Sequence, residues 1–458
     1  MEKNTTDFMK TDGLRILKII HGYPPNYNAG SEVYSQSIVN ELKKKHQITV
    51  FTREENEYIP DFNFRNEHKE NVDFVYVNMA RSKDGYSHQL FNLRFENFLK
   101  ETRFDIAHIG HLNHLSIGII DVLHKSKIPI VLTLHDFWLM CPRGQFLQRN
   151  FDGKNLFNLC DKQVNSECAI NCYSMYFAHD KMSVEQSLVY ECAPSEKVGN
   201  DNLSDIGYWT NWIDTRMNAM KRICEKIDLF VAPSRYLMNR FVSDFVIPKE
   251  KIMYLDYGFP TQYLLPIEPK TNGVFTFGYI GTHIPSKGIN VLIEAFAKLK
   301  GNSKLKIFGR EQGQNTQALK AMAKLSKNEI EFCGEYINQN LATTVFNHVN
   351  CIVVPSIWTE NSPLVIHEAQ QCRIPVITAN IGGMAEYVEH QINGLQFEHR
   401  NAESLSHQMQ WALENQDSMK KLGAKGYLYS KTGDVIAIEE HCLELENMYS
   451  QVIHQTNE

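Results

Sequence analysis

The sequence predicts an α/β protein with two Rossmann-like, doubly wound domains that face each other across a cleft. Short apolar runs alternate with amphipathic, helix-like stretches, and this alternation is typical of parallel sheets with right-handed crossovers. The alternation stops between residues 256 and 273, where prolines gather without periodicity, and then restarts. A chain of 458 residues is also too long for one ordinary core. Because open α/β sheets bind ligands beyond the carboxyl ends of their strands, we expect the site in the cleft.

The first array covers residues 1–256 and forms the expected N-terminal domain. Its predicted strands are Leu14–Ile20, Ile48–Phe51, Phe74–Val77, Ile106–Ile109, Ile130–Leu134 and Leu229–Ala232. Its predicted helices are Gly30–Leu42, His88–Glu101, Leu115–His124 and Tyr208–Lys226. Residues from about 140 to 200 are polar, carry cysteines and show little periodicity, so we interpret them as an insertion in this domain.

The second array covers residues 257–432 and forms the expected C-terminal domain. Its predicted strands are Phe275–Ile280, Leu305–Phe308, Ile330–Phe332, Cys351–Val354 and Pro375–Thr378. Its predicted helices are Ile289–Lys300 and Pro363–Cys372. Residues 433–458 are expected to form a C-terminal helix that crosses back to the first domain.

Composition narrows the function classes. The apolar fraction is 43% and the formal net charge is −6, which gives no reason to expect a nucleic-acid partner. No apolar run is long enough to span a bilayer, and the first residues lack the apolar core of a secretory signal. We therefore expect a cytoplasmic protein. The lysine clusters at 43–45 and 420–421 are interpreted as solvated helix faces, and peripheral contact with the inner membrane surface is left open.

The segment after the strand Cys351–Val354 carries the strongest chemical signal. Ser362 is expected to cap a helix whose first position is Pro363. The N–H groups at such a helix start suit a diphosphate. Glu360 lies just before them, and Glu368 lies in the helix on an apolar stripe, where an acid needs partners such as ribose hydroxyls. The plainer interpretation is that Glu360 is an acid in a surface loop and Glu368 is a half-exposed residue of the helix.

Other candidates follow strands of the first array. Gly30 opens a helix after the first strand, and a glycine there lets the backbone approach a phosphate. This is not the G-x-G-x-x-G fingerprint, so NAD is not supported. His135 and Asp136 follow the most apolar strand, and His111 follows a neighbouring one. Each histidine alone has an equally ordinary structural interpretation.

Glu360 and Glu368, with seven residues between them in a Glu-Asn-Ser-Pro-Leu context, resemble the E-x7-E motif of retaining GT-B glycosyltransferases, in particular family 4. Further segments resemble family elements in the same order: Tyr23-Pro24-Pro25 with Gly30-Ser31-Glu32, Tyr257-Gly258-Phe259, Gly281 to Gly288, Gly382-Gly383 with Glu386, and Asn393-Gly394. The resemblance covers nearly the whole chain apart from the insertion. It implies the GT-B fold, with an acceptor-side N-terminal domain over residues 1–256 and a nucleotide-sugar-binding C-terminal domain over residues 257–432.

The resemblance implies a retaining glycosyltransferase of the hexosyltransferase class. Such an enzyme moves a sugar from a UDP- or GDP-sugar to a glycan or lipid-linked acceptor, in cell-surface polysaccharide or glycolipid biosynthesis. Two alternatives stay open: another GT-B enzyme, such as a sugar-nucleotide epimerase or a phosphorylase, and a catalytically silent sugar-nucleotide-binding protein. No cofactor or metal is expected to be required for catalysis.

The resemblance also implies residue roles. The catalytic candidates are Glu360, His135 and Lys287. The donor-binding candidates are Gly30, Thr282, Arg310, Asn361, Ser362, Pro363, Leu364, Val365 and Glu368. The acceptor-side candidates are His111 and Asp136. Thr282 departs from the family, which often has arginine there, and Arg310 at a strand end is the expected compensating cation.

Four cysteines of the insertion have two interpretations. Cys141, Cys160, Cys168 and Cys172 supply enough thiolates for a structural zinc, although their spacing is not that of a standard knuckle. The other interpretation is four free thiols in a semi-buried loop.

Overall fold

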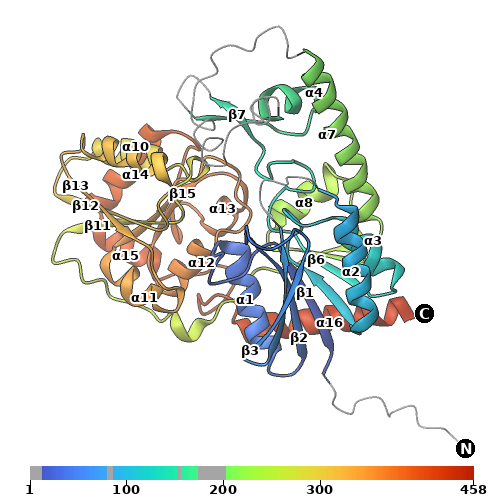
Figure 1. The fold of residues 1–458 in the computed structure, drawn as a ribbon. Coiled ribbons are helices and arrows are strands. Elements are labelled where there is room, and N and C mark those ends of the chain that lie inside the picture. The colour runs from blue at the N-terminus through green and yellow to red at the C-terminus, as the bar shows by residue number, and fades with distance from the viewer. Residues whose placement is uncertain (1–12, 80–85, 152–155, 174–202, 458) are drawn as a thin grey trace, which may run out of the picture.

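The computed structural model describes residues 13–79, 86–151, 156–173 and 203–457. Two α/β domains lie side by side, one in the blue-to-green part of the chain and one in the yellow-to-orange part (Figure 1). Residues 174–200 of the expected insertion lie outside the described residues. No helix in the described ranges is long and apolar enough to cross a membrane.

The N-terminal domain is built on an eight-stranded sheet with the order β10-β9-β6-β5-β1-β2-β4-β3. Its strands are β1 (Arg15–Ile20), β2 (Gln47–Glu54), β3 (Phe64–Lys69), β4 (Val72–Asn78), β5 (Ile106–Ile109), β6 (Ile130–Thr133), β9 (Leu229–Ala232) and β10 (Ile252–Tyr254). Its main helices are α1 (Gly30–Leu42), α2 (Gln89–Glu101), α3 (Gly118–Lys125), α7 (Leu203–Cys224) and α8 (Arg235–Ser243).

The C-terminal domain is built on a six-stranded parallel sheet with the order β13-β12-β11-β14-β15-β16. Its strands are β11 (Phe275–Ile280), β12 (Ser303–Phe308), β13 (Glu329–Gly334), β14 (Cys351–Val354), β15 (Val376–Ala379) and β16 (Gly394–Phe397). Its longer helices are α9 (Ile289–Ala297), α10 (Gly313–Ala323), α12 (Leu364–Gln371), α13 (Gly382–Tyr387), α14 (Ala402–Glu414) and α15 (Gln416–Gly423). Numbered within the domain, the strand order is 3-2-1-4-5-6, that of a dinucleotide-binding fold.

The central strands are buried along their whole length. Every residue of β5, β6, β9, β14 and β15 is buried, as expected for parallel strands with helices on both faces. The expectation of parallel pairing fails at one edge, where β3 pairs with β4 in the antiparallel direction. The sequence of β3, FRNEHK, is almost entirely exposed, so it lacks the apolar signal that marks the other strands.

Each sheet has one point where the strand order reverses. In the N-terminal sheet it lies between β1 and β5, and in the C-terminal sheet between β11 and β14. At such a point the loops leave toward opposite faces and open a crevice. The loops after these four strands therefore carry the residues that face a ligand.

The insertion begins with the hairpin of β7 (Leu147–Phe151) and β8 (Phe157–Leu159). A short helix, α4 (Asn165–Cys168), and a π-helical turn, η1 (Ala169–Tyr173), follow and contact α7. This module projects at the top of the N-terminal domain (Figure 1).

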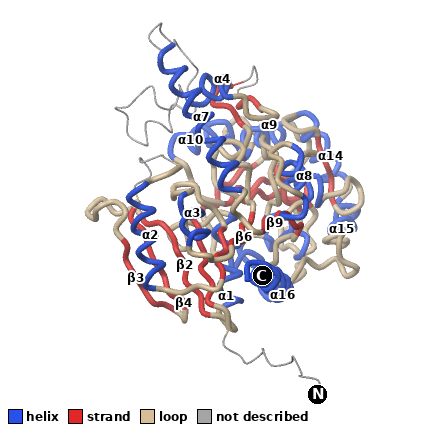
Figure 2. Tube along the Cα trace, turned by 90° about the vertical axis from the view of Figure 1, so that its right-hand side faces the viewer, coloured by secondary structure: helices blue, strands red, loops and turns tan. Residues whose placement is uncertain are grey.

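The C-terminal helix α16 (Ile438–Asn457) packs against α1 and β6 of the N-terminal domain. It runs beneath that domain in Figure 1, and Figure 2 shows it beside α1. Its buried polar contacts with the domain include the Tyr34 hydroxyl with His441 Nε2 at 2.7 Å and the Tyr449 hydroxyl with His108 Nδ1 at 2.6 Å. The chain thus passes between the domains twice.

Candidate active site

The two crevices open into one cleft with a cavity of about 410 Å³ between the domains, a size suited to a small organic ligand. All residues that the sequence singled out for catalysis, donor binding or acceptor binding line this cleft: His135, Lys287, Glu360, Gly30, Thr282, Arg310, Asn361, Ser362, Pro363, Leu364, Val365, Glu368, His111 and Asp136. The fold therefore brings together residues from several separate loops and helix starts.

Lys287 and Glu360 meet where the C-terminal sheet reverses its strand order. Lys287 ends the short turn η5 (Pro285–Lys287) after β11, and its Nζ lies 2.7 Å from Glu360 Oε1 in the loop after β14. The Ser356 hydroxyl donates to the same carboxylate oxygen. Gly288, at φ +68°, allows this approach, because a Cβ there would lie 2.0 Å from the Pro355 carbonyl oxygen.

Two glycines support the Glu360 loop from behind. The Gly383 N–H donates to the Glu360 carbonyl at 2.8 Å. A Cβ on Gly383 would lie 1.1 Å from the Asn361 carbonyl oxygen, and Gly382 adopts a φ of +60°. The start of α13 therefore sets the position of the Glu360–Asn361 backbone.

Helix α12 begins at Leu364 with Pro363 in the N-cap position, and no side chain caps it. The expected cap by Ser362 is therefore wrong: its hydroxyl donates instead to Asp256 Oδ1 at 3.3 Å. Because no side chain takes up the first N–H groups of α12, they remain available to an anion in the cleft.

Arg310 and Thr282 line the C-terminal side of the cleft, as Lys287 does. The Nε of Arg310 is buried and has no hydrogen-bond partner among the described residues. A buried guanidinium nitrogen without a hydrogen-bond partner is energetically unfavourable. A ligand that supplies an acceptor to this nitrogen would remove that penalty.

Glu368 projects from α12 into the same half of the cleft. Burial raises its pKa to about 7, so near neutral pH a good part of this group carries a proton. A carboxyl in that state both donates and accepts hydrogen bonds, which suits a pair of vicinal hydroxyls.

This pKa gives a testable prediction for Glu368→Gln. The unfolded chain releases the proton near its usual pKa of 4.5 and the folded chain near 7, so Glu368 lowers stability as pH rises through that window. We expect Glu368→Gln to stabilise the free protein at pH 8 by up to about 3 kcal/mol, with little change at pH 4. We also expect it to weaken nucleotide binding.

Thermal melts at both pH values and calorimetric titration with the nucleotide test this prediction. Glu294→Gln, which changes an exposed acid on α9, is the matched control. An equal stability change at pH 4 and pH 8 would contradict the assignment of a raised pKa.

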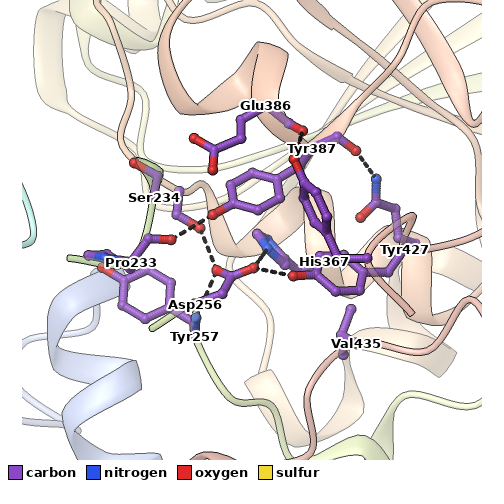
Figure 3. A network of polar contacts seen from close by, with 12 residues as sticks. Pro233, Ser234, Asp256, Tyr257, His367, Glu386, Tyr387, Tyr427 and Val435 are labelled. Atoms are coloured by element: carbon purple, nitrogen blue, oxygen red, sulfur yellow. Dashed lines mark hydrogen bonds and ion pairs between the residues drawn. The ribbon is translucent and has the colours of Figure 1, made fainter. Parts of the chain in front are cut away.

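Asp256 organises the junction between the domains (Figure 3). Its Oδ2 accepts from the Tyr427 hydroxyl at 2.6 Å and lies 3.0 Å from His367 Nε2, while the Tyr257 N–H donates to Oδ1 at 2.8 Å. Burial alone would raise the pKa of Asp256, but His367 and these donors hold it below its usual value. Through Ser362 and His367 this carboxylate holds the segment before α12 and the first turn of that helix.

No pattern in the sequence selected Asp256. It lies in the linker, and its partner His367 lies between the two glutamates of the motif, where it resembles a simple helix residue. The only feature of the sequence that could have indicated a role for Asp256 is its position, as an acid at the boundary between the two α/β arrays.

Asn361 connects the donor loop to the opposite domain. Its Nδ2 donates to the carbonyls of Leu134 and His135, and its Oδ1 accepts from the Ser234 hydroxyl at 2.6 Å. The side chain is thus engaged across the cleft, and what Asn361 offers to a donor is its backbone.

His135 stands at the carboxyl end of β6 and faces the cleft. Its Nδ1 shares a hydrogen bond of 2.6 Å with the Tyr257 hydroxyl, and its buried Nε2 has no partner among the described residues. Burial and the nearby Lys18 charge hold its pKa well below the usual value. The ring is therefore neutral, and its free nitrogen serves as a hydrogen-bonding group rather than as a proton donor of the imidazolium type.

Four further side chains gather where the N-terminal sheet reverses its strand order. His21 follows β1, His111 follows β5, Glu32 lies in the first turn of α1, and Asp136 follows His135. His21 Nε2 is 3.3 Å from Glu32 Oε1, and His111 Nε2 is 3.3 Å from Asp136 Oδ2. The two imidazole rings touch edge to face, with centroids 4.6 Å apart. The sequence singled out His111 and Asp136 but missed His21, and it used Glu32 only as part of a motif.

The four cysteines of the insertion lie in one module. Burial is the main cause that raises the pKa of Cys168 to about 12, and the nearby thiols of Cys141 and Cys172 raise it further. Among the described residues, no group of three or more His, Cys, Asp or Glu is arranged to hold a metal ion. Zinc at these cysteines thus stays a prediction of the sequence.

Elemental analysis of the purified protein separates the two interpretations. Four zinc-binding thiolates would give one zinc per chain and a melting temperature that a chelator lowers. Free thiols would give no stoichiometric metal, melting that is insensitive to chelator, and rapid reaction with a thiol reagent on unfolding.

Both domains match known families. The model for glycosyl transferases group 1 matches residues 265–429, and the model for Glycosyltransferase Family 4 matches residues 29–170. An uncharacterized glycosyltransferase of Methanocaldococcus jannaschii is 26% identical over 209 residues, which are 44% of this chain and 55% of that protein. The capsular polysaccharide biosynthesis glycosyltransferase CapM of Staphylococcus aureus is 24% identical over 256 residues, 51% of this chain and 66% of that protein. The chain thus spans about half to two thirds of the length of these relatives.

Solved structures agree with the fold over nearly the whole chain. Anabaena HepE in complex with UDP and glucose superposes with a TM-score of 0.63 at 15% identity, covering 96% of this chain and 100% of that one. Sucrose-phosphate synthase from Thermosynechococcus elongatus gives a TM-score of 0.64 at 16% identity, with the same coverage. At this level of sequence identity the structural similarity shows the fold alone, and the matching family models indicate the class of protein. The chain therefore has the GT-B fold, and each of its two domains contains a segment that matches a glycosyltransferase family model.

Proposed function

We propose that the protein is a retaining hexosyltransferase that moves a sugar from a nucleotide diphosphate donor to a glycan or lipid-linked acceptor in polysaccharide or glycolipid assembly. The observation that carries the proposal is the convergence of Lys287, Arg310 and the uncapped start of α12 on one wall of the cleft. Two cations and free N–H groups together match a diphosphate. The neighbouring Glu368 suits the ribose.

In this proposal, the protein works mainly by charge stabilisation and orientation. As the bond between sugar and phosphate breaks, negative charge grows on the leaving diphosphate, and Lys287 and Arg310 stabilise it. Glu360 and the free Nε2 of His135 hold sugar hydroxyls beside the reacting carbon. The acceptor hydroxyl attacks from the face that the diphosphate leaves, and a phosphate oxygen takes its proton.

Two similar proteins support the proposed glycosyl transfer, but they do not identify the donor or the acceptor of this chain. The HepE structures contain UDP, glucose or UDP-glucose, and the name of the S. aureus relative refers to capsular polysaccharide biosynthesis. We extend both features to this chain as part of the proposal. Contact with the inner membrane surface belongs to the proposal as well, and sedimentation with anionic vesicles tests it.

The experiment that tests the donor is a thermal-shift panel of UDP, GDP, ADP and their sugars, because a ligand that binds only the folded state raises the melting temperature. Proton NMR of the product then reads the configuration at the transferred carbon. Retained configuration supports the mechanism. A panel with no stabilising nucleotide, or a product of inverted configuration, would overturn the proposal or its stereochemical part, respectively.

A further inference from the structure

The two walls of the cleft differ in their cations. Lys287 and Arg310 lie on the C-terminal wall, together with the acids Glu335, Glu360 and Glu368. The described residues on the N-terminal wall include no lysine or arginine, but they do include Glu32 and Asp136. Each wall lies where its own sheet reverses strand order, so the contrast is between two equivalent places in two similar domains.

The protonation state of the N-terminal wall follows from its hydrogen bonds. The Asn113 N–H donates to His111 Nδ1 at 2.9 Å, so Nδ1 is an acceptor and the N–H of this ring lies on Nε2, which faces Asp136. Burial lowers the pKa of His21 to about 4, so His21 is neutral as well. Burial alone would raise the pKa of Glu32, yet His21 and Ser31 hold it at about 2. Glu32 is therefore ionised at physiological pH.

His21 has one nitrogen to spare. Its Nε2 faces Glu32, while its Nδ1 is buried and has no hydrogen-bond partner among the described residues. With the proton on Nε2, Nδ1 keeps an unused lone pair, and His21 is one of the residues that line the cleft. A buried polar atom without a partner is costly, so a ligand that supplies a donor here gains binding energy.

Glu32, Asp136 and His21 Nδ1 are all hydrogen-bond acceptors. A ligand that satisfies them must bring donors, and hydroxyl groups do so without charge. A phosphate or carboxylate brings acceptors and negative charge and would face two carboxylates with no lysine or arginine among the described residues of this wall.

Resting on the glycosyl transfer proposed above, we infer that the end of the acceptor that enters the cleft is an uncharged, polyhydroxylated sugar. One of its hydroxyls donates to His21 Nδ1, and the Glu32–His21–His111–Asp136 cluster discriminates against sugars phosphorylated at that end. His21 and Glu32 are thereby acceptor-binding residues. A lipid-linked acceptor fits this inference only if its diphosphate stays outside the cleft.

Paired acceptors test the inference. Glucose, galactose and N-acetylglucosamine are each compared with their 6-phosphates as stimulants of nucleotide release from the donor found in the thermal-shift panel. We expect the neutral member of a pair to be favoured by at least about tenfold in kcat/KM. Glu32→Gln should reduce that preference, and His21→Ala should raise KM for the neutral sugar. Glu41→Gln, an acid on the same helix paired with Lys44, is the matched control and should change neither.

Binding alone separates this inference from the proposed function. Saturation-transfer NMR of the same sugar pairs, with UDP present, reads acceptor binding even if no transfer occurs. Signals from neutral sugars that weaken in His21→Ala support the inference. Stronger binding or stimulation by the phosphorylated member, or no interaction with any neutral sugar, overturns it. Absence of nucleotide release from every donor counts against the proposed function and leaves the NMR result to decide the acceptor class.

Discussion

Replacing Lys287 with alanine is expected to lower the rate of nucleotide release from the sugar nucleotide by about a thousandfold, the loss typical when a main electrostatic stabiliser of a transition state is removed. Its Nζ is the only lysine ammonium among the described residues of the cleft wall, and it already lies 2.7 Å from Glu360. Steady-state release of the nucleotide, coupled to its detection, measures the effect.

Two further variants keep this result interpretable. Lys287→Ala also leaves Glu360, whose side chain is 8% exposed, without its cation, so the variant should melt at a lower temperature. Lys287→Arg restores the charge and should recover the melting temperature and part of the rate. Lys320→Ala, which breaks an exposed pair with Glu311, should leave both unchanged. A folded Lys287→Ala protein with wild-type turnover would refute the site.

Gly383→Ala is expected to abolish activity with no change in any side chain that faces the cleft. The added Cβ would lie 1.1 Å from the Asn361 carbonyl oxygen, so the backbone of the Glu360–Asn361 loop must move. That movement separates Glu360 from Lys287 and breaks the contacts of Asn361 with the N-terminal domain. Because near-attack geometry tolerates little displacement, we expect a loss of at least about a hundredfold in kcat/KM.

Gly207→Ala is the matched control for this substitution. Gly207 lies in α7, and an added Cβ there would meet nothing within 4 Å, so alanine should slightly raise stability. Melting curves and kcat/KM of both variants complete the comparison. A Gly383→Ala protein with normal kcat/KM would show that the tight contact behind the loop is relaxed without consequence.

Much of the fold was predictable because parallel, doubly covered strands are continuous apolar runs. Strands such as β6 and β14 and the break between the two arrays were readable for that reason. The edge strand β3 was not, because its residues face solvent and obey no burial pattern. Short elements with mixed surfaces, such as β16 and α15, likewise carried no periodic signal strong enough to select.

The candidate site likewise has a part that the sequence could predict and a part that it could not. Residues within the Glu360–Glu368 motif could be placed in the cleft because strand ends and helix starts meet at one edge of a sheet. The partners that hold them could not. Asp256 and Tyr427 are separated by 171 positions, and His21 meets His111 only because β1 and β5 are neighbours in a sheet whose order the sequence does not state. The Ser362 cap failed for the same reason: a distant carboxylate competes for its hydroxyl.

The second passage of the chain between the domains has a consequence for protein engineering. Helix α16 belongs by packing to the N-terminal domain, although it follows the C-terminal domain in sequence. The N-terminal half of the protein is therefore a discontinuous module, residues up to the linker plus residues 438–457. A chimera that exchanges the C-terminal domain at the linker alone would join α16 of one parent to the sheet of another and mismatch the Tyr34–His441 and His108–Tyr449 contacts. A graft bounded at both passages would keep each core with its own helix.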